Sequence, residues 1–129
     1  MSGSGQDRIE TVIDTTVLED IRDLMEVDFP DLVRRFLKDS ADLIDQLDQG
    51  IARGDADSVY RAAHTLKSSS AALGALALSD RAKHLEALGR SGVLDGAAAE
   101  AAEAHVQFVR AKETLEKCLE DGSQPWTPT

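Results

Sequence analysis

The residues best suited to chemistry lie in the segment 64–70 (HTLKSSS), where a histidine is followed by a lysine and a run of serines. If this segment is helical, each residue turns the helix by about 100°, so His64 lies nearly opposite the apolar Leu66 and points outward. An exposed imidazole is substantially neutral near pH 7 and can act as a nucleophile that carries a covalently bound group. Lys67, one turn later, supplies a cation where a phosphoryl group on His64 would lie. The pattern therefore indicates a nucleophilic histidine suited to an anionic group.

The surroundings of His64 decide between this interpretation and an ordinary surface histidine, which its position alone would favour. Ser68, Ala71 and Ala75 share its face and are small, so a partner could approach the imidazole closely. The segment 58–94 has five basic and two acidic residues, although the whole chain has a net charge of −10. Such a region fits a local anion or an acidic partner. On charge alone a solvated helix surface explains it better, so the region matters only together with the histidine.

The composition indicates one helical domain and excludes several classes of function. The chain has 129 residues, and residues 31–124 contain no proline, which is typical of an all-α protein. The single cysteine, Cys118, excludes a disulfide-stapled fold. The negative charge argues against nucleic acid and against an anionic membrane as partners. Because no apolar run could span a membrane and the N-terminus lacks a signal-peptide core, we expect a cytoplasmic protein.

Apolar residues recur at helical spacing in five segments, and these helices must position the histidine. Short connections between long amphipathic helices favour antiparallel neighbours. We therefore expect an all-α fold, an antiparallel up-down four-helix bundle with an additional short N-terminal helix. The predicted helices are 16–25, 30–53, 55–73, 76–88 and 96–119.

Caps and glycines mark the predicted helix boundaries. Thr16 and Glu19 fit a capping box for the first helix, and Asp28 is a candidate cap for the second. Gly54 is expected to end the second helix. The remaining boundary signals are Gly74, which bends or ends the third helix, and Gly89 and Gly92, which bracket the end of the fourth.

The two ends of the chain have a different composition from its middle. Residues 1–8 are expected to form a flexible leader, which begins MSGSG as expression remnants do, and residues 122–129 a flexible tail. Trp126 in this tail could dock on the body. The bundle itself is expected to occupy residues 9–121.

The segment 64–75 (HTLKSSSAALGA) resembles the signature of histidine-containing phosphotransfer (HPt) domains, which is roughly H-x-L-K-G-x-S-x-x-L-G-A. The Leu-Glu pair at 85–86 also resembles this family, and the match covers about residues 14–119, including the helix order. The resemblance implies that His64 exchanges a phosphoryl group with the aspartate of a receiver domain, in a response regulator or a hybrid histidine kinase.

The resemblance also implies a monomeric carrier rather than an enzyme. No G-x-x-x-x-G-K-[ST] loop for a nucleotide is present in the sequence. No cofactor of its own is expected, because Mg²⁺ in this reaction belongs to the receiver domain. One residue departs from the family pattern, since Ser68 stands where glycine is usual. Serine is small, so we expect transfer to survive, with an altered rate or partner choice.

Two sets of residues are expected to assist His64. Glu86 could orient the imidazole or cap a charge network, and both alternatives stay open at this point. The first two helices flank the histidine in this family and dock the receiver domain. The supporting set is Lys67, Ser68, Lys83, Glu86 and Arg90, although an ordinary solvated surface explains Lys83 and Arg90 better. The predicted partner interface is Tyr60, Ala71, Ala75, Ile21, Met25, Phe29, Leu32 and Arg35, although core packing explains Phe29 and Ile21 equally well.

Other candidates and other functions have less support. His84 is expected at the surface, His105 is expected to be partly buried in packing, and Cys118 to be a small apolar contact. One alternative function is an HPt-like docking module that binds receiver domains or other proteins without carrying phosphate. Another is a purely structural bundle that associates with itself.

Overall fold

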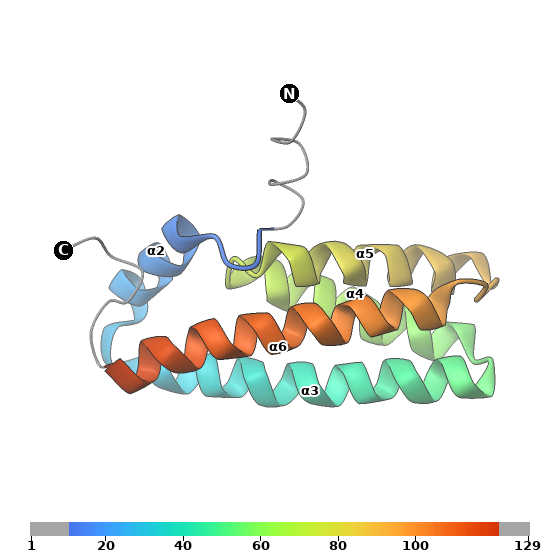
Figure 1. Cartoon of the computed structure of the whole chain (residues 1–129), viewed down its shortest axis with the longest axis horizontal. Helices are drawn as coiled ribbons and strands as arrows, with labels where there is room; N and C mark the ends of the chain where they lie inside the picture. The colour runs from blue at the N-terminus through green and yellow to red at the C-terminus, as the bar shows by residue number, and fades with distance from the viewer. Residues whose placement is uncertain (1–10, 122–129) are drawn as a thin grey trace, which may run out of the picture.

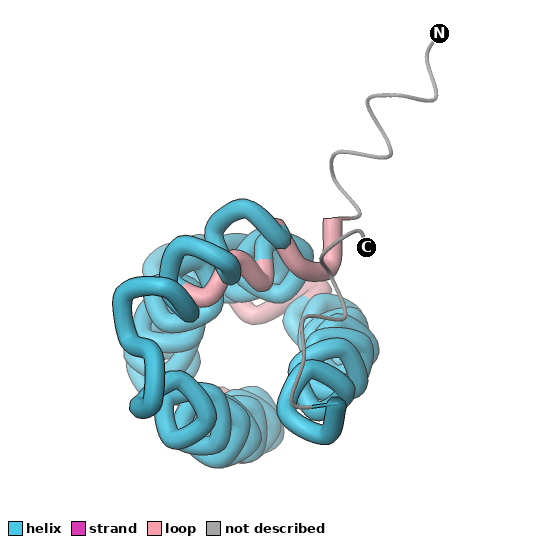
Figure 2. The backbone as a smooth tube through the Cα atoms, turned by 90° about the vertical axis from the view of Figure 1, so that its left-hand side faces the viewer, coloured by secondary structure: helices cyan, strands magenta, loops and turns pink. Residues whose placement is uncertain are grey.

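The computed structural model describes residues 11–121, and this part of the chain is helical without any strand. Four long helices run side by side and alternate in direction, and a short helix lies across one end of them (Figure 1). Seen from that end, the long helices surround a common core (Figure 2). The predicted bundle with an extra N-terminal helix is confirmed. The elements are α2 (Thr15–Met25), the 3₁₀-helix η1 (Glu26–Asp28), α3 (Phe29–Arg53), α4 (Ala56–Ala72), α5 (Leu76–Ser91) and α6 (Ala97–Asp121).

Side-chain caps fix the starts of two helices. Asp14 caps α2, since its carboxylate accepts hydrogen bonds from the backbone N–H groups of Thr16 and Val17. The predicted capping box of Thr16 and Glu19 is therefore wrong, because Thr16 already lies within the helix. Asp55 caps α4 by accepting bonds from the backbone and the hydroxyl of Ser58, which lower the pKa of its carboxyl.

Glycines with positive φ end the helices that must turn back. Gly54 ends α3 at φ 69°, and Gly92 ends α5 at φ 81°, three residues later than predicted. Gly74, at φ 78°, separates α4 from α5 instead of bending one helix. A Cβ atom at Gly74 would lie 2.9 Å from the carbonyl oxygen of Asp14, so this link packs against the start of α2. Gly89 lies inside α5 and does not mark its end.

The core is built from the apolar stripes of all the helices. Many of the buried residues on α4, α5 and α6 are alanines, whose small side chains let these helices approach closely. The largest fully buried apolar side chains are Leu18, Val33, Leu47, Val59, Leu66, Leu78, Leu85 and Leu115. None of the helices in the described range could span a membrane. The predictions for residues 1–8 and for the tail with Trp126 lie outside the described residues.

Candidate functional site

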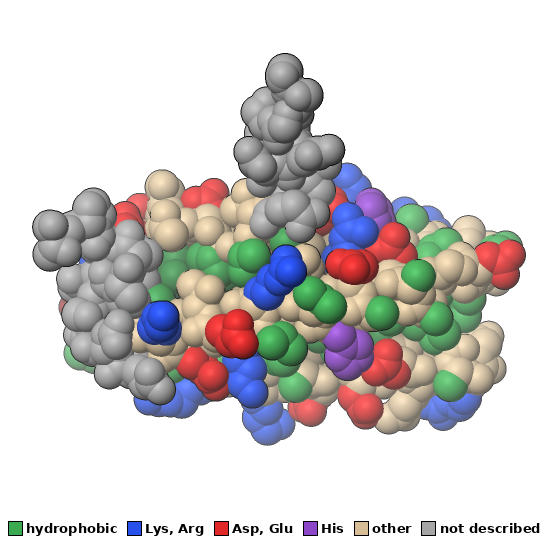
Figure 3. Space-filling view, viewed as in Figure 1, with side chains coloured by type: hydrophobic (Ala, Val, Ile, Leu, Met, Phe, Trp, Pro, Cys, Tyr) green, Lys and Arg blue, Asp and Glu red, His purple; other side chains and the backbone are tan. Residues whose placement is uncertain are grey.

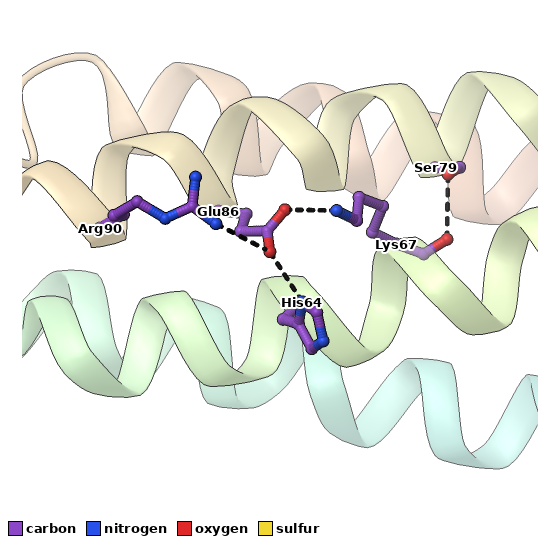
Figure 4. Close-up of polar contacts among 5 residues, drawn as sticks. All are labelled: His64, Lys67, Ser79, Glu86 and Arg90. Carbon is purple, nitrogen blue, oxygen red and sulfur yellow. Dashed lines mark hydrogen bonds and ion pairs between the residues drawn. The ribbon is translucent and has the colours of Figure 1, made fainter.

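His64 projects from the middle of α4 and contacts Glu86 of the neighbouring helix α5 (Figure 4). The imidazole Nδ1 lies 2.7 Å from the carboxylate Oε2 of Glu86. The His64 side chain is 55% exposed, whereas the Glu86 side chain is only 5% exposed. The outward position predicted for His64 is confirmed. Of the two roles left open for Glu86, the structure places it directly against the imidazole.

Glu86 is a buried carboxylate that three basic side chains share. Lys67 Nζ lies 2.7 Å from its Oε1, and an Arg90 guanidinium nitrogen lies 3.5 Å from its Oε2. The hydrogen bond from Lys67 and then that of His64 lower the pKa of Glu86, and they outweigh burial, which acts in the opposite direction. Glu86 is therefore an anion at neutral pH.

The charge of Glu86 determines which ring nitrogen of His64 bears the proton. A carboxylate only accepts hydrogen bonds, so the contact at 2.7 Å is made by an Nδ1–H that donates. In the neutral imidazole the lone pair then lies on Nε2, an assignment made from the hydrogen-bond partner. Figure 4 shows this second nitrogen on the side of the ring away from Glu86. The arrangement presents a nucleophilic nitrogen to a partner outside the bundle.

Tyr60 and Arg90 complete the surroundings of the imidazole. The Tyr60 ring, one turn before His64, stacks on the imidazole with a centroid distance of 5.9 Å and an interplanar angle of 21°. The Arg90 guanidinium lies over the Tyr60 ring, 5.4 Å from its centroid. Arg90 thus links the stacked ring to the carboxylate of Glu86. The sequence predicted Tyr60 as part of the partner interface but not this arrangement of rings, because the position of Arg90 depends on how α5 crosses α4.

Two contacts hold α5 against α4 on either side of the site. A Cβ atom at Gly89 would lie 2.5 Å from the backbone nitrogen of Tyr60, so only glycine allows this approach. On the other side, the Ser79 hydroxyl donates to the backbone carbonyl of Lys67 at 2.9 Å (Figure 4). The sequence predicted that Gly89 marks the end of a helix, because a glycine at a close contact between two helices has the same sequence pattern as a glycine at a helix end.

Comparisons with known proteins match this chain to one family. A model of the Hpt domain matches residues 31–124. The chain belongs to the Hpt family. The crystal structure of histidine-containing phosphotransfer protein B (HptB) from Pseudomonas aeruginosa PAO1 is similar, with a TM-score of 0.81 and 28% sequence identity, over 84% of this chain and 94% of that one. No curated protein matches the chain significantly.

Membership of the Hpt family establishes the general activity. The protein takes part in histidine phosphotransfer within a phosphorelay, in which Hpt domains interact with receiver domains. Hpt domains are phosphotransfer modules and not kinases. Among the described side chains, those of residues 11–119, no group of three or more His, Cys, Asp or Glu could hold a metal ion.

Only some of the residues predicted to support His64 lie together at the Hpt site, by which we mean His64 and the side chains around Glu86. Lys67 and Arg90 join Glu86, as described. Ser68 is exposed on α4, one turn after His64. Lys83 is exposed on α5 and makes no ion pair with any described side chain of residues 11–119. The structure therefore gives Lys83 no part in the cluster.

The predicted partner interface needs two corrections. Ala75 is fully buried at the start of α5, so the prediction that it shares the outward face of His64 is wrong, because α4 ends at Ala72. Phe29 is 5% exposed and belongs to the core. The remaining members reach the surface wholly or in part, namely Ile21, Met25, Leu32, Arg35, Tyr60 and Ala71.

A hollow of about 190 Å³ lies between α3 and α4, close to the Hpt site. Ser69 is at its edge, five residues after His64, which is about 8 Å along the helix. Arg35 and Asp39 supply a charge of each sign to its lining. The other lining residues are Leu32, Phe36, Ala72 and Leu73.

The other two histidines lie apart from the Hpt site. His84 is exposed as predicted, and its Nδ1 lies 3.5 Å from Glu100. The prediction that His105 is partly buried is wrong, because it is exposed on α6 with Nε2 2.8 Å from Asp48 of α3. The face over α5, α6 and α3 carries acidic and basic side chains intermixed (Figure 3). Cys118 is buried in the core, as expected for a small apolar contact.

Proposed function

We propose that His64 is the phosphorylated residue and that Nε2 is the atom that receives the phosphoryl group. The hydrogen bond from His64 Nδ1 to the buried Glu86 carboxylate carries this proposal, because it leaves the Nε2 lone pair on the exposed side of the ring. The partner is the aspartyl phosphate of a receiver domain. As Nε2 attacks phosphorus, an N–P bond forms, the P–O bond of the aspartyl phosphate breaks, and the aspartate carboxylate leaves.

Lys67 and Arg90 are the cations that balance the incoming charge. A phosphoryl group on Nε2 adds negative charge at the outer end of the ring. Lys67 follows His64 by one turn, and its side chain is 34% exposed, so its ammonium group can serve both Glu86 and the phosphoryl oxygens. Ser68, also exposed one turn after His64, can donate a hydroxyl hydrogen bond to the same oxygens.

The receiver domain is proposed to dock over the surface around His64 that α2, α3 and α4 form. Tyr60, Ala71, Ile21, Met25, Leu32 and Arg35 supply apolar contact and a positive charge there. The hollow beside Ser69 continues this surface and fits an apolar side chain of the partner.

We propose that Mg²⁺ is supplied by the receiver domain and that this chain is a carrier without catalytic activity of its own. We also propose that the protein is a monomer and that it acts in the cytoplasm.

Label transfer from a panel of phosphorylated receiver domains tests the proposal. We expect label on the wild type that is lost in acid and survives base, and no label on His64→Gln. His105→Gln is the matched control, because it removes another exposed histidine with a carboxylate partner, and it should accept label normally. Label on His64→Gln would overturn the assignment. Stable binding of a receiver without any label would favour the docking module instead.

A further inference from the structure

The contact between His64 and Glu86 has a consequence for the phosphorylated state. When Nε2 attacks, the ring still carries its Nδ1 proton, so the first product is a cationic phosphoimidazolium beside the Glu86 carboxylate. Without an anionic partner, such a ring releases this proton to water as the pH rises. The carboxylate lies 2.7 Å from Nδ1 and is 5% exposed, so water screens its charge only weakly.

We propose that Glu86 keeps the Nδ1 proton on the ring for as long as His64 is phosphorylated. This inference rests on the proposed function and concerns how the same site releases its phosphoryl group. In outgoing transfer the N–P bond breaks while the receiver aspartate forms a new P–O bond, and the electron pair of the broken bond returns to Nε2. A ring that has kept its proton leaves as neutral imidazole, whereas a ring that has lost it must leave as imidazolate, a far poorer leaving group. Transfer in either direction then needs no proton movement at His64.

The charged groups around the ring allow Glu86 to act in this way. On α4, Lys67 and Tyr60 flank His64, and on α5, Glu86 and Arg90 face it. On α3, Arg35 and Asp39 line the hollow beside Ser69 and have opposite charges. Glu86 is the group that accepts a hydrogen bond from Nδ1 and carries a negative charge.

Glu86→Gln removes the negative charge but keeps a hydrogen-bond acceptor, because the amide oxygen can still accept the hydrogen bond from Nδ1–H. The protein is phosphorylated with phosphoramidate, and the imidazole nitrogens of His64 are followed by NMR as the pH is raised. We expect the phosphorylated ring of the wild type to lose its Nδ1 proton at a pH higher by about one unit or more than in Glu86→Gln. We also expect the wild type to pass its phosphoryl group to a receiver at a nearly constant rate between about pH 6 and pH 8. The variant should slow about tenfold per pH unit once its ring deprotonates.

Two further variants make the result decisive. Glu86→Asp retains a carboxylate, so its phosphorylated ring should lose the Nδ1 proton at a pH closer to that of the wild type than to that of Glu86→Gln. Asp48→Asn removes a carboxylate from exposed His105 and should leave the titration of His64 unchanged. Coincident titration curves for the wild type and Glu86→Gln, both folded by circular dichroism, would overturn the inference while leaving His64 as the carrier. Failure of His64 to accept any phosphoryl group would overturn the proposed function itself.

Discussion

Gly89 of α5 passes Tyr60 of α4 so closely that a Cβ atom at Gly89 would lie 2.5 Å from the Tyr60 backbone nitrogen. Glu86 precedes Gly89 by three residues and contacts the His64 imidazole. Arg90 follows Gly89 directly and lies over the Tyr60 ring. The absence of one side chain therefore determines how near the buried carboxylate comes to the histidine. The geometry of the site depends on this helix crossing as much as on its charged residues.

Gly89→Ala is expected to separate α4 from α5 and to weaken both stability and transfer. The added methyl group meets backbone atoms, which cannot move aside as a flexible side chain would. Overpacking of this kind costs about 1–3 kcal/mol of unfolding free energy. Urea unfolding and the rate of phosphotransfer measure the two effects. Gly54→Ala, at a positive φ with open space around it, should lose stability but transfer normally; equal transfer rates in the two variants would contradict the account.

Lys67→Gln is expected to slow phosphotransfer by about a hundredfold or more, as the loss of one group that stabilises developing charge does. The variant removes one of the two cations proposed to balance the phosphoryl charge and one of the partners of Glu86. Rapid-quench kinetics with a phosphorylated receiver measure the rate. Lys38→Gln, which removes an exposed lysine paired with Asp42 on α3, should be unaffected. A wild-type rate in Lys67→Gln would show that this ammonium group has no role.

The contribution of Glu86 to stability is expected to depend on pH. Lys67 and His64 hold the pKa of its carboxyl below the ordinary value of 4.5, so its stabilising effect is complete above that pH and is lost as the pH falls through the lower pKa of the folded state. Urea unfolding of Glu86→Gln should show a loss of about 1–3 kcal/mol at neutral pH that shrinks in acid. Asp42→Asn, at an exposed pair, should show little difference at any pH. A loss for Glu86→Gln that does not change with pH would contradict this ion pairing.

Leu32→Asp is expected to weaken receiver binding by tenfold or more, about 1.4 kcal/mol, without preventing chemical phosphorylation of His64. The residue lines the hollow between α3 and α4 and is partly exposed, so an acid there would oppose an apolar partner side chain. Calorimetry with the cognate receiver domain measures the affinity. Val109→Asp makes the same change at an exposed position of α6, which packs on α3 and α5, and should bind normally. Equal affinities for both variants would remove α3 from the interface.

Ser68→Gly tests the position at which this chain departs from the HPt pattern. Because Ser68 is exposed and small, we expect the transfer rate to change by less than tenfold, and the added helix flexibility to cost about 0.5–1 kcal/mol of stability. Parallel measurements of the rate and of thermal unfolding check both expectations. Loss of transfer in the glycine variant would mean that the serine hydroxyl is essential here.

The sequence was sufficient for the parts of this molecule that depend on local pattern. Helical periodicity predicted the bundle, the outward position of His64 and the adjacent Lys67, because each depends on angles along one helix. It did not predict the burial of Glu86 or the stack of Tyr60 on His64, since both depend on how closely α5 crosses α4. The burial of His105 was predicted wrongly for a similar reason, because its carboxylate partner Asp48 is on another helix.

The atom of His64 that carries the phosphoryl group can be identified directly after transfer from a phosphorylated receiver domain. The protein is labelled with ¹⁵N in its histidine rings, phosphorylated by the receiver and examined by ¹⁵N and ³¹P NMR. We predict a phosphorus–nitrogen bond at Nε2 of His64, with a proton on Nδ1 that Glu86 accepts in a hydrogen bond. A phosphoryl group on Nδ1 of His64, or on any other residue, would contradict the account.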